Sequence, residues 1–154
     1  MSQSVRLLEG ITQRVIDTDR LRTAVLERAA DDPATAPERT GGLIHGNVSS
    51  AAFWQETMLS LPEDLRVIAL DLRGFGASQT LPVDATRGVC DYSDDIASAL
   101  DAMGIRTAHL VGWSMGGGVV MQFALDHPVL SLTLQAPVSP YGFGGTRRDG
   151  TRLN

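Results

Sequence analysis

The chain of 154 residues is long enough to fold around one core, and its 43% hydrophobic and 20% charged residues exclude disordered and collagen-like chains. Its formal net charge of -5 leaves no basic surface for nucleic acid or for an anionic membrane. The single cysteine, Cys90, can form neither an internal disulfide nor a cysteine-type zinc site. The first residues have no apolar signal-peptide core, and no run approaches the ~18 apolar residues of a membrane span. We therefore expect a cytoplasmic protein without nucleic-acid or membrane partners.

The predicted elements begin with an antiparallel hairpin over residues 13–29, where two alternating apolar runs flank the turn Asp17-Thr18-Asp19. Residues 31–40 are rich in proline and charge and predict an exposed loop. From residue 41 onward, short apolar strands alternate with amphipathic helices, the strands at 41–45, 66–71, 108–113 and 130–137 and the helices at 50–61, 92–103 and 114–126. This alternation predicts an α/β fold, a doubly wound, mostly parallel sheet with helices on both faces.

Three glycine-containing segments follow three of the predicted parallel strands. They are His45-Gly46-Asn47, the loop of residues 71–78, and the segment of residues 112–116. Ligands of such sheets bind outside the carboxyl ends of the strands. We therefore expect these three loops to lie together at one edge of the sheet.

The segment Gly112-Trp113-Ser114-Met115-Gly116 has the pattern G-x-S-x-G between a strand and a helix. A sharp, strained turn that exposes the serine leaves no room for side chains two residues to either side. The turn also points the hydroxyl at a helix N-terminus, whose free N–H groups favour an oxyanion. The pattern predicts that Ser114 is a nucleophile, and the alternative is a turn in which Ser114 merely caps the helix.

A phosphate-binding loop is the other common use of glycines between a strand and a helix. It requires a Gly-Lys-Ser/Thr ending, or three spaced glycines that open a dinucleotide-binding unit. The segment "GWSMGGG" has no lysine, and "RGFGASQ" lacks the third glycine. We therefore expect no nucleotide or other cofactor, and no metal.

The loop His45-Gly46-Asn47 follows its strand directly, and Gly46 lets a backbone N–H approach a substrate. The N–H of Asn47 or Val48, together with that of Met115, would supply the two donors that acyl transfer needs. A histidine this close to an oxyanion-binding loop is more typical of a structural role, which we expect for His45.

Four segments together resemble the N-terminal part of an α/β-hydrolase fold enzyme. They are "LIHGNVSS", the pair "FW" at Phe53-Trp54, "VIALDLRGFGAS" with its D-x-R-G-x-G-x-S loop, and "LVGWSMGG". The four segments appear in the family's order between Gly41 and Pro137. The resemblance implies an α/β-hydrolase-type sheet in which Ser114 attacks an acyl carbonyl. It does not specify the substrate.

The chain departs from the family after the serine. The resemblance implies a catalytic acid and then a histidine beyond Ser114, but His45, His109 and His127 do not occupy that place, and we expect structural roles for all three. Asp149 is the only carboxylate beyond the last predicted strand, in a glycine-rich segment more typical of a lid than of a catalytic acid.

The same departure defines the domain organisation that we expect. Residues 1–154 form the N-terminal part of a single α/β-hydrolase domain, with core motifs at 41–137 and the start of a lid or a flexible tail at 138–154. The cap and the C-terminal strands are missing, which would leave an exposed apolar edge after Pro128. The chain is either one piece of a hydrolase cut in a lid loop, with the acid and histidine on a companion polypeptide, or a truncated product; we favour the first.

The expected function is a serine hydrolase that cleaves an ester, thioester, lactone or amide of a small molecule through an acyl-enzyme on Ser114. Trp113 either lines the acyl pocket or packs beneath it. Phe75 is a weaker candidate for the pocket, and we favour core packing for it. Two alternatives stay open: a non-catalytic α/β-hydrolase-fold module that binds a ligand or partner, and a carbon–carbon bond hydrolase or acyltransferase with the same serine.

Overall fold

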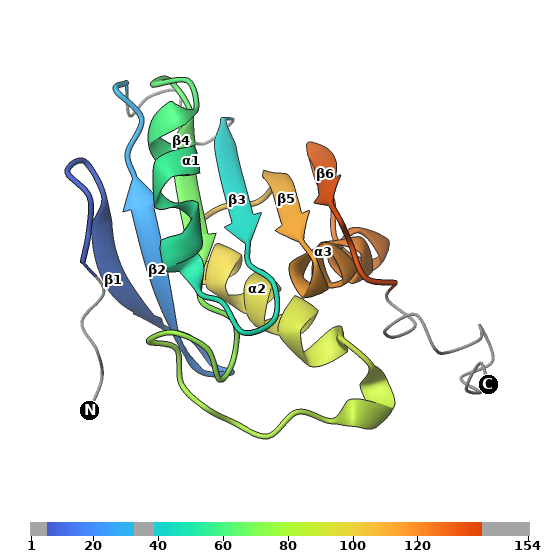
Figure 1. Cartoon of the computed structure of the whole chain (residues 1–154). Coiled ribbons are helices and arrows are strands. Elements are labelled where there is room, and N and C mark those ends of the chain that lie inside the picture. The colour runs from blue at the N-terminus through green and yellow to red at the C-terminus, as the bar shows by residue number, and fades with distance from the viewer. Residues whose placement is uncertain (1–5, 33–38, 140–154) are drawn as a thin grey trace.

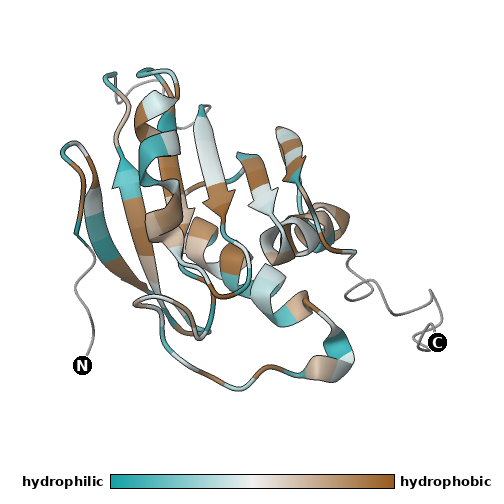
Figure 2. Cartoon of the chain, in the orientation of Figure 1, coloured by the Kyte–Doolittle hydropathy of each residue, from teal (hydrophilic) through white to brown (hydrophobic). Residues whose placement is uncertain are grey.

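A computed structural model describes residues 6–32 and 39–139 and contains one six-stranded sheet, with the strands in the order β1-β2-β4-β3-β5-β6 (Figure 1). Strands β1 (Thr12–Asp17) and β2 (Arg22–Arg28) form the expected antiparallel hairpin, and β1 lies at one edge of the sheet. This outer strand carries hydrophilic residues in Figure 2, because both of its faces are largely exposed.

The remaining strands form the parallel part of the sheet. Strand β3 (Thr40–Ile44) lies between β4 (Arg66–Leu70) and β5 (His109–Trp113), and β6 (Ser131–Gln135) pairs with β5 on its outer side. Only the pairings of β2 with β1 and β4 are antiparallel within the described residues. The mostly parallel, doubly wound sheet predicted from the sequence is therefore confirmed.

Helices cover both faces of the sheet. The short 3-10 helix η1 (Ala51–Trp54) and α1 (Gln55–Ser60) pack on one face, and α2 (Cys90–Ala102) and α3 (Met115–Asp126) on the other (Figure 1). A further 3-10 turn, η2 (Ala85–Arg87), precedes α2. The continuous helix expected at residues 50–61 is wrong in its first turn, which is 3-10 because the Phe53 N–H donates to Ser50 O at 3.1 Å, three residues back.

Strand β4 shows why the central strands are apolar throughout. Its alternate side chains enter different cores: Val67 and Ala69 face the side of α1, whereas Ile68 and Leu70 face α2 and α3. All four are buried, as expected for a strand covered on both faces. In the described part of the chain, no helix has the length and apolar character that crossing a membrane requires.

Strand β6 is the other edge of the sheet, opposite β1 (Figure 1). Among the described residues it pairs only with β5, so its outer row of backbone groups is unpaired there. Leu130, just before the strand, and Leu134, within it, are 45% and 39% exposed. The described structure therefore has the exposed edge that we expected after Pro128.

Candidate active site

The segment Gly112-Trp113-Ser114-Met115-Gly116 connects the end of β5 to the start of α3, as the pattern predicted. Ser114 lies between the two elements with φ +54° and ψ -118°, a conformation that an L-residue rarely adopts. Its N–H donates to Gln135 O at 3.0 Å, and its carbonyl accepts from the N–H of Val138 at 3.0 Å. The end of β6 and the residues after it therefore hold the strained turn in place.

The glycines on either side of Ser114 allow α3 to approach the sheet closely. A Cβ added to Gly112 would lie 2.5 Å from the carbonyl oxygen of Gly116, and one added to Gly116 would overlap the carbonyl oxygens of Ile44 and His45. A Cβ at Gly117 would lie 2.6 Å from Pro137 Cβ. The sequence argument that side chains do not fit two residues from the serine is thus confirmed by the packing.

The side chain of Ser114 does not cap the helix that it precedes. Ser114 is the N-cap residue of α3, yet its hydroxyl makes no capping hydrogen bond to that helix. The residue is partly exposed. A serine that only terminated the helix would direct its hydroxyl to the N–H groups of the first turn, so the geometry disfavours the capping alternative.

The two expected oxyanion donors lie near this serine. Met115 is the first residue of α3, so its N–H has no carbonyl acceptor within its own helix. On the facing loop, the Val48 N–H donates to the Asn47 side-chain oxygen at 3.0 Å, and Val48 has a φ of +52°. Since the N–H of Val48 is engaged, the geometry favours Asn47 as the donor of the pair that the sequence left open.

His45 fixes the loop that carries Asn47. The side chain is fully buried, its Nε2 accepts from the Leu72 N–H at 3.0 Å, and its Nδ1 lies 2.7 Å from Gly46 O. These bonds require a neutral imidazole with the proton on Nδ1. Burial lowers the pKa of His45 below its ordinary value, although the Gly46 carbonyl and Asp71 partly oppose this shift.

The other two histidines make contacts elsewhere. His109 Nδ1 lies 2.8 Å from the Ser131 hydroxyl on the paired strand β6, and the His127 ring packs on Phe123 with centroids 4.6 Å apart. The described residues contain no hydrogen bond between a histidine ring and the Ser114 hydroxyl. Asp149 and most of the segment 138–154 lie outside the described residues.

The buried carboxylate of Asp71 joins the loop of residues 71–78 to the start of η1. It accepts from the N–H of Ala51 at 2.6 Å and from the N–H of Ala77 at 2.8 Å. Ser78, at the end of the same loop, donates to Asp71 O at 2.7 Å. Gly76, with a φ of +53°, passes so close to the carboxylate that no Cβ fits there. The glycine loop of residues 71–78 is therefore a scaffold for the site, and it adjoins the His45 loop as predicted.

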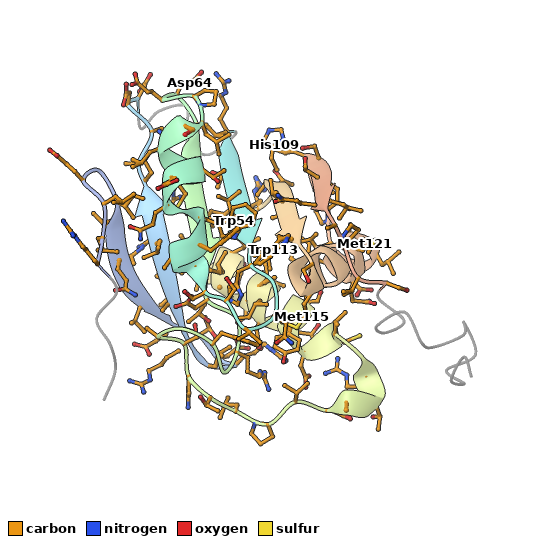
Figure 3. All side chains as sticks on the ribbon, in the orientation of Figure 1. Trp54, Asp64, His109, Trp113, Met115 and Met121 are labelled. Atoms are coloured by element: carbon orange, nitrogen blue, oxygen red, sulfur yellow. The ribbon has the colours of Figure 1, made fainter. Side chains whose placement is uncertain are left out.

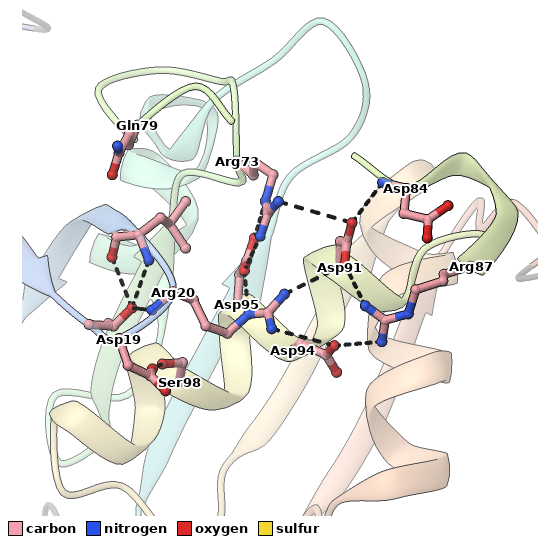
Figure 4. A network of polar contacts seen from close by, with 12 residues as sticks. Asp19, Arg20, Arg73, Gln79, Asp84, Arg87, Asp91, Asp94, Asp95 and Ser98 are labelled. Carbon is pink, nitrogen blue, oxygen red and sulfur yellow. Dashed lines mark hydrogen bonds and ion pairs between the residues drawn. The ribbon is translucent and has the colours of Figure 1, made fainter. Parts of the chain in front are cut away.

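An arginine and aspartate network anchors this loop to α2 (Figure 4). The Arg73 guanidinium binds both carboxylate oxygens of Asp95 at 2.7 Å, and Arg20 Nε reaches the same carboxylate at 2.7 Å. Arg87 binds Asp91 at 2.6 Å. The N–H of Asp84, with the arginines around it, holds the pKa of Asp91 below its ordinary value. The network thus connects the β1–β2 turn, the loop after β4 and the first turns of α2.

Trp113 stacks against Phe53 on the side of the sheet that α1 covers. The ring centroids are 4.5 Å apart with an interplanar angle of 12°, and Phe53 in turn meets the buried Trp54 edge-on. Figure 3 labels the two tryptophans, Trp54 and Trp113. Phe75 packs against the opposite core and contacts the His45 ring at 5.3 Å, as expected for a core residue.

An open groove of about 870 Å³ lies away from Ser114. It is bordered by the β1–β2 turn and by the C-terminal ends of α2 and α3, and no elbow or oxyanion-loop residue lines it. Within residues 6–32 and 39–139, no group of three or more His, Cys, Asp or Glu side chains is arranged to hold a metal ion.

Three features of the site were not predicted from the sequence. Ala136 has a φ of +43° and turns the chain after β6 back over the elbow. The Phe53–Trp113 stack and the Arg73–Asp95 pair join residues far apart in the sequence. Asp71 and Arg73 did carry a signal, because both stand in the D-x-R-G-x-G-x-S loop, but nothing in the sequence identified their partners.

Comparisons with known proteins identify the fold family of the chain. A family model described as alpha/beta hydrolase fold matches residues 43–150. The dihydrolipoyllysine-residue acetyltransferase component of the acetoin cleaving system of Cupriavidus necator is 40% identical over 109 residues, which are 70% of this chain and 28% of that protein. Carboxylesterase YbfK of Bacillus subtilis is 30% identical over 99 residues, 64% of this chain and 32% of the esterase. The solved structure of serine hydrolase CCSP0084 from Cycloclasticus zankles superposes with a TM-score of 0.74 at 29% identity, covering 90% of this chain and 49% of that one.

The chain belongs to the alpha/beta hydrolase fold family, because the family model matches most of its length. It spans about a third of the length of the curated relatives that it matches, 28% and 32% for the two named above.

Proposed function

We propose that this chain carries the nucleophile and the oxyanion hole of a serine hydrolase that cleaves an ester, thioester, lactone or amide. The observation that carries the proposal is the geometry of Ser114, which is strained, partly exposed and not used as a helix cap. Strained residues of this kind cluster at active sites, where the surrounding structure compensates for their cost.

In the proposed reaction the Ser114 hydroxyl attacks the acyl carbonyl while a histidine takes its proton. The N–H groups of Met115 and Asn47 stabilise the oxyanion of the tetrahedral intermediate, and one such donor typically contributes about 3–4 kcal/mol. The leaving group departs with a proton from the histidine, and water then hydrolyses the acyl-enzyme on Ser114.

The proposed general base lies outside these 154 residues. His45 has both ring nitrogens engaged, and no hydrogen bond in the described part of the chain links His109 or His127 to Ser114. We propose that a companion polypeptide, or further residues of the same protein, supplies the histidine and the acid and pairs with the free edge of β6.

Acyl transfer to an acceptor other than water is a second candidate. It would use the same acyl-enzyme, and the similarity to a relative named as an acetyltransferase component supports it. Measuring product formation with and without an added alcohol or thiol distinguishes transfer from hydrolysis.

A fluorophosphonate probe tests the nucleophile, since it labels a serine only where a base activates it. The companion-containing protein should be labelled on the peptide that contains Ser114, and Ser114→Ala should abolish labelling without loss of far-UV circular dichroism. Labelling that survives in a folded Ser114→Ala variant would disprove the assignment. Labelling of the 154-residue chain alone at the same rate would instead place the base within it.

A non-catalytic module is the remaining alternative from another class. Such a protein would bind its ligand or partner equally well with alanine at position 114 and would not react with the probe even when the companion is present.

A further inference from the structure

We infer that Trp113 is a positioning residue that supports the oxyanion loop through Gly46, rather than a wall of the acyl pocket. The inference rests on the proposed function only where it concerns catalysis. The structural part concerns the order of the loop and can be tested without any substrate.

The first observation is the close approach of Gly46 to both the indole ring and Ser114. A Cβ built on Gly46 would lie 3.0 Å from Trp113 Cε3, 3.1 Å from Trp113 Cζ3 and 3.0 Å from Ser114 Cβ. The backbone of Gly46 therefore lies directly against the edge of the tryptophan ring and against Ser114. Asn47, whose N–H we assign to the oxyanion hole, is the next residue.

The second observation is that one face of the ring is occupied. Phe53 stacks on Trp113 with nearly parallel planes, and Phe53 meets Trp54, which is 3% exposed in the core under α1. The same 3-10 turn is anchored at its first residue, because the Ala51 N–H donates to Asp71 at 2.6 Å. An unbroken series of contacts thus runs from the core through Phe53 and Trp113 to Gly46.

The third observation is that the same glycine is held independently by the histidine before it. His45 contacts the Gly46 carbonyl at 2.7 Å, and its own ring is fixed by the N–H of Leu72. Without the indole, the Gly46 peptide would keep this hydrogen bond but lose the packed surface beside it. Since Asn47 and Val48 are exposed, their backbone has little other packing. We therefore expect removal of the ring to loosen the Asn47 N–H and to leave the rest of the fold ordered.

Backbone NMR relaxation of the 154-residue chain tests the structural part. In the wild type the amides of Gly46 and Asn47 should have order parameters near those of rigid backbone, about 0.85. Trp113→Leu should lower both below about 0.6, and Trp113→Phe, which keeps a ring against Phe53, should give intermediate values. Phe123→Leu is the matched control: it removes a buried aromatic ring from the opposite core, outside this series of contacts, and its destabilisation should not be concentrated in this loop.

The catalytic part uses the companion-containing enzyme. Misplacement of a group at the reacting centre lowers the rate of the chemical step, so Trp113→Leu should reduce kcat by about 10- to 100-fold with KM within about twofold. A ring that lined the acyl pocket would change KM and the preference among acyl chain lengths instead.

Wild-type-like order at Gly46 and Asn47 in Trp113→Leu would overturn the inference, as would a wild-type loop that is already mobile. If Trp113→Leu does not fold, equal order parameters in Trp113→Phe and the wild type together with a changed KM would also overturn it. The proposed function would be refuted if the companion-containing wild-type enzyme were inactive. The structural part of the inference would still stand if Trp113→Leu showed the expected loss of order at Gly46 and Asn47.

Discussion

Replacing Gly116 by alanine tests the close approach of α3 to the sheet with a single methyl group. The added Cβ would lie 2.5 Å from His45 O and even closer to Ile44 O, whereas ordinary contacts begin near 3.4 Å. Both neighbours are backbone atoms at the end of β3, which pairs with β4 on one side and β5 on the other. They cannot rotate away as a side chain would, so the helix has to shift by about 1 Å.

The cost of this shift can be bounded. Overpacking typically costs about 1–3 kcal/mol, and we expect the upper end because the obstructing atoms belong to paired strands. Replacing a helical glycine by alanine stabilises the helix by up to about 1 kcal/mol, which offsets part of this cost. The net loss in the free energy of unfolding should therefore be about 2 kcal/mol, which lowers Tm by about 4–8 °C for a chain of this size. Gly116→Val should cost more, because a β-branched side chain is larger and restricted in a helix.

Urea unfolding followed by far-UV circular dichroism measures this change, with Gly41→Ala as the matched control. A Cβ at Gly41 would meet only the Leu65 side chain, at 3.4 Å for its Cδ2, and the position has no positive φ. Gly41→Ala should be neutral or stabilise the protein by up to about 1 kcal/mol. If Gly116→Ala unfolds at the same urea concentration as Gly41→Ala, with the same m-value, the elbow is not packed as described.

Three further predictions concern strain, the buried ion pair and pH. Ser114→Gly should be about 1 kcal/mol more stable than Ser114→Ala in thermal unfolding, because glycine adopts a φ of +54° without strain; equal Tm values would argue against a strained turn. Asp95→Asn should destabilise the chain by about 3 kcal/mol, because it leaves the buried Arg73 guanidinium without its bidentate partner. The added change Arg73→Met should recover part of that loss, and simple additivity in urea titrations would contradict the pairing. Because the pKa of His45 is lowered in the fold, the unfolded chain binds this proton more tightly; the stability that His45 contributes should be constant above about pH 6.5 and fall as the pH decreases below it, and His45→Gln should remove the slope in the range above that in which the carboxylates titrate.

The sequence was sufficient to predict a mostly parallel sheet, the succession of strands and helices along the chain, and the position of three loops at one edge of the sheet. These features follow from periodicity and from one geometric rule, that parallel strands end at the same edge. Strands β4 and β5 contain short apolar runs, and glycines stand in the loop of residues 71–78 and two positions to either side of Ser114. The expected position of Ser114 depended in addition on the pattern G-x-S-x-G between a strand and a helix.

The finer assignments depended on contacts that no sequence pattern encodes. The choice between Asn47 and Val48 depends on one hydrogen bond from the Val48 N–H to the neighbouring side chain. The role that we infer for Trp113 depends on Phe53, which is 60 positions earlier in the sequence and lies against Trp113 in the assembled fold. Such contacts are consequences of the assembled sheet, so periodicity cannot reveal them.

The strained residues show how the fold maintains the elbow. The non-glycine residues with positive φ in the described chain are Val48, Ser114 and Ala136, which follow β3, β5 and β6 respectively. Each such conformation typically costs about 1–3 kcal/mol, so neighbouring contacts must compensate for it. The turn at Ala136 brings Val138 back to Ser114, and Gln135 at the end of β6 accepts the N–H of the same serine. The pairing of β6 with β5 therefore supports the conformation of Ser114, and a partner that bound the edge of β6 left unpaired among the described residues would stabilise the turn at Ser114 as well as the sheet.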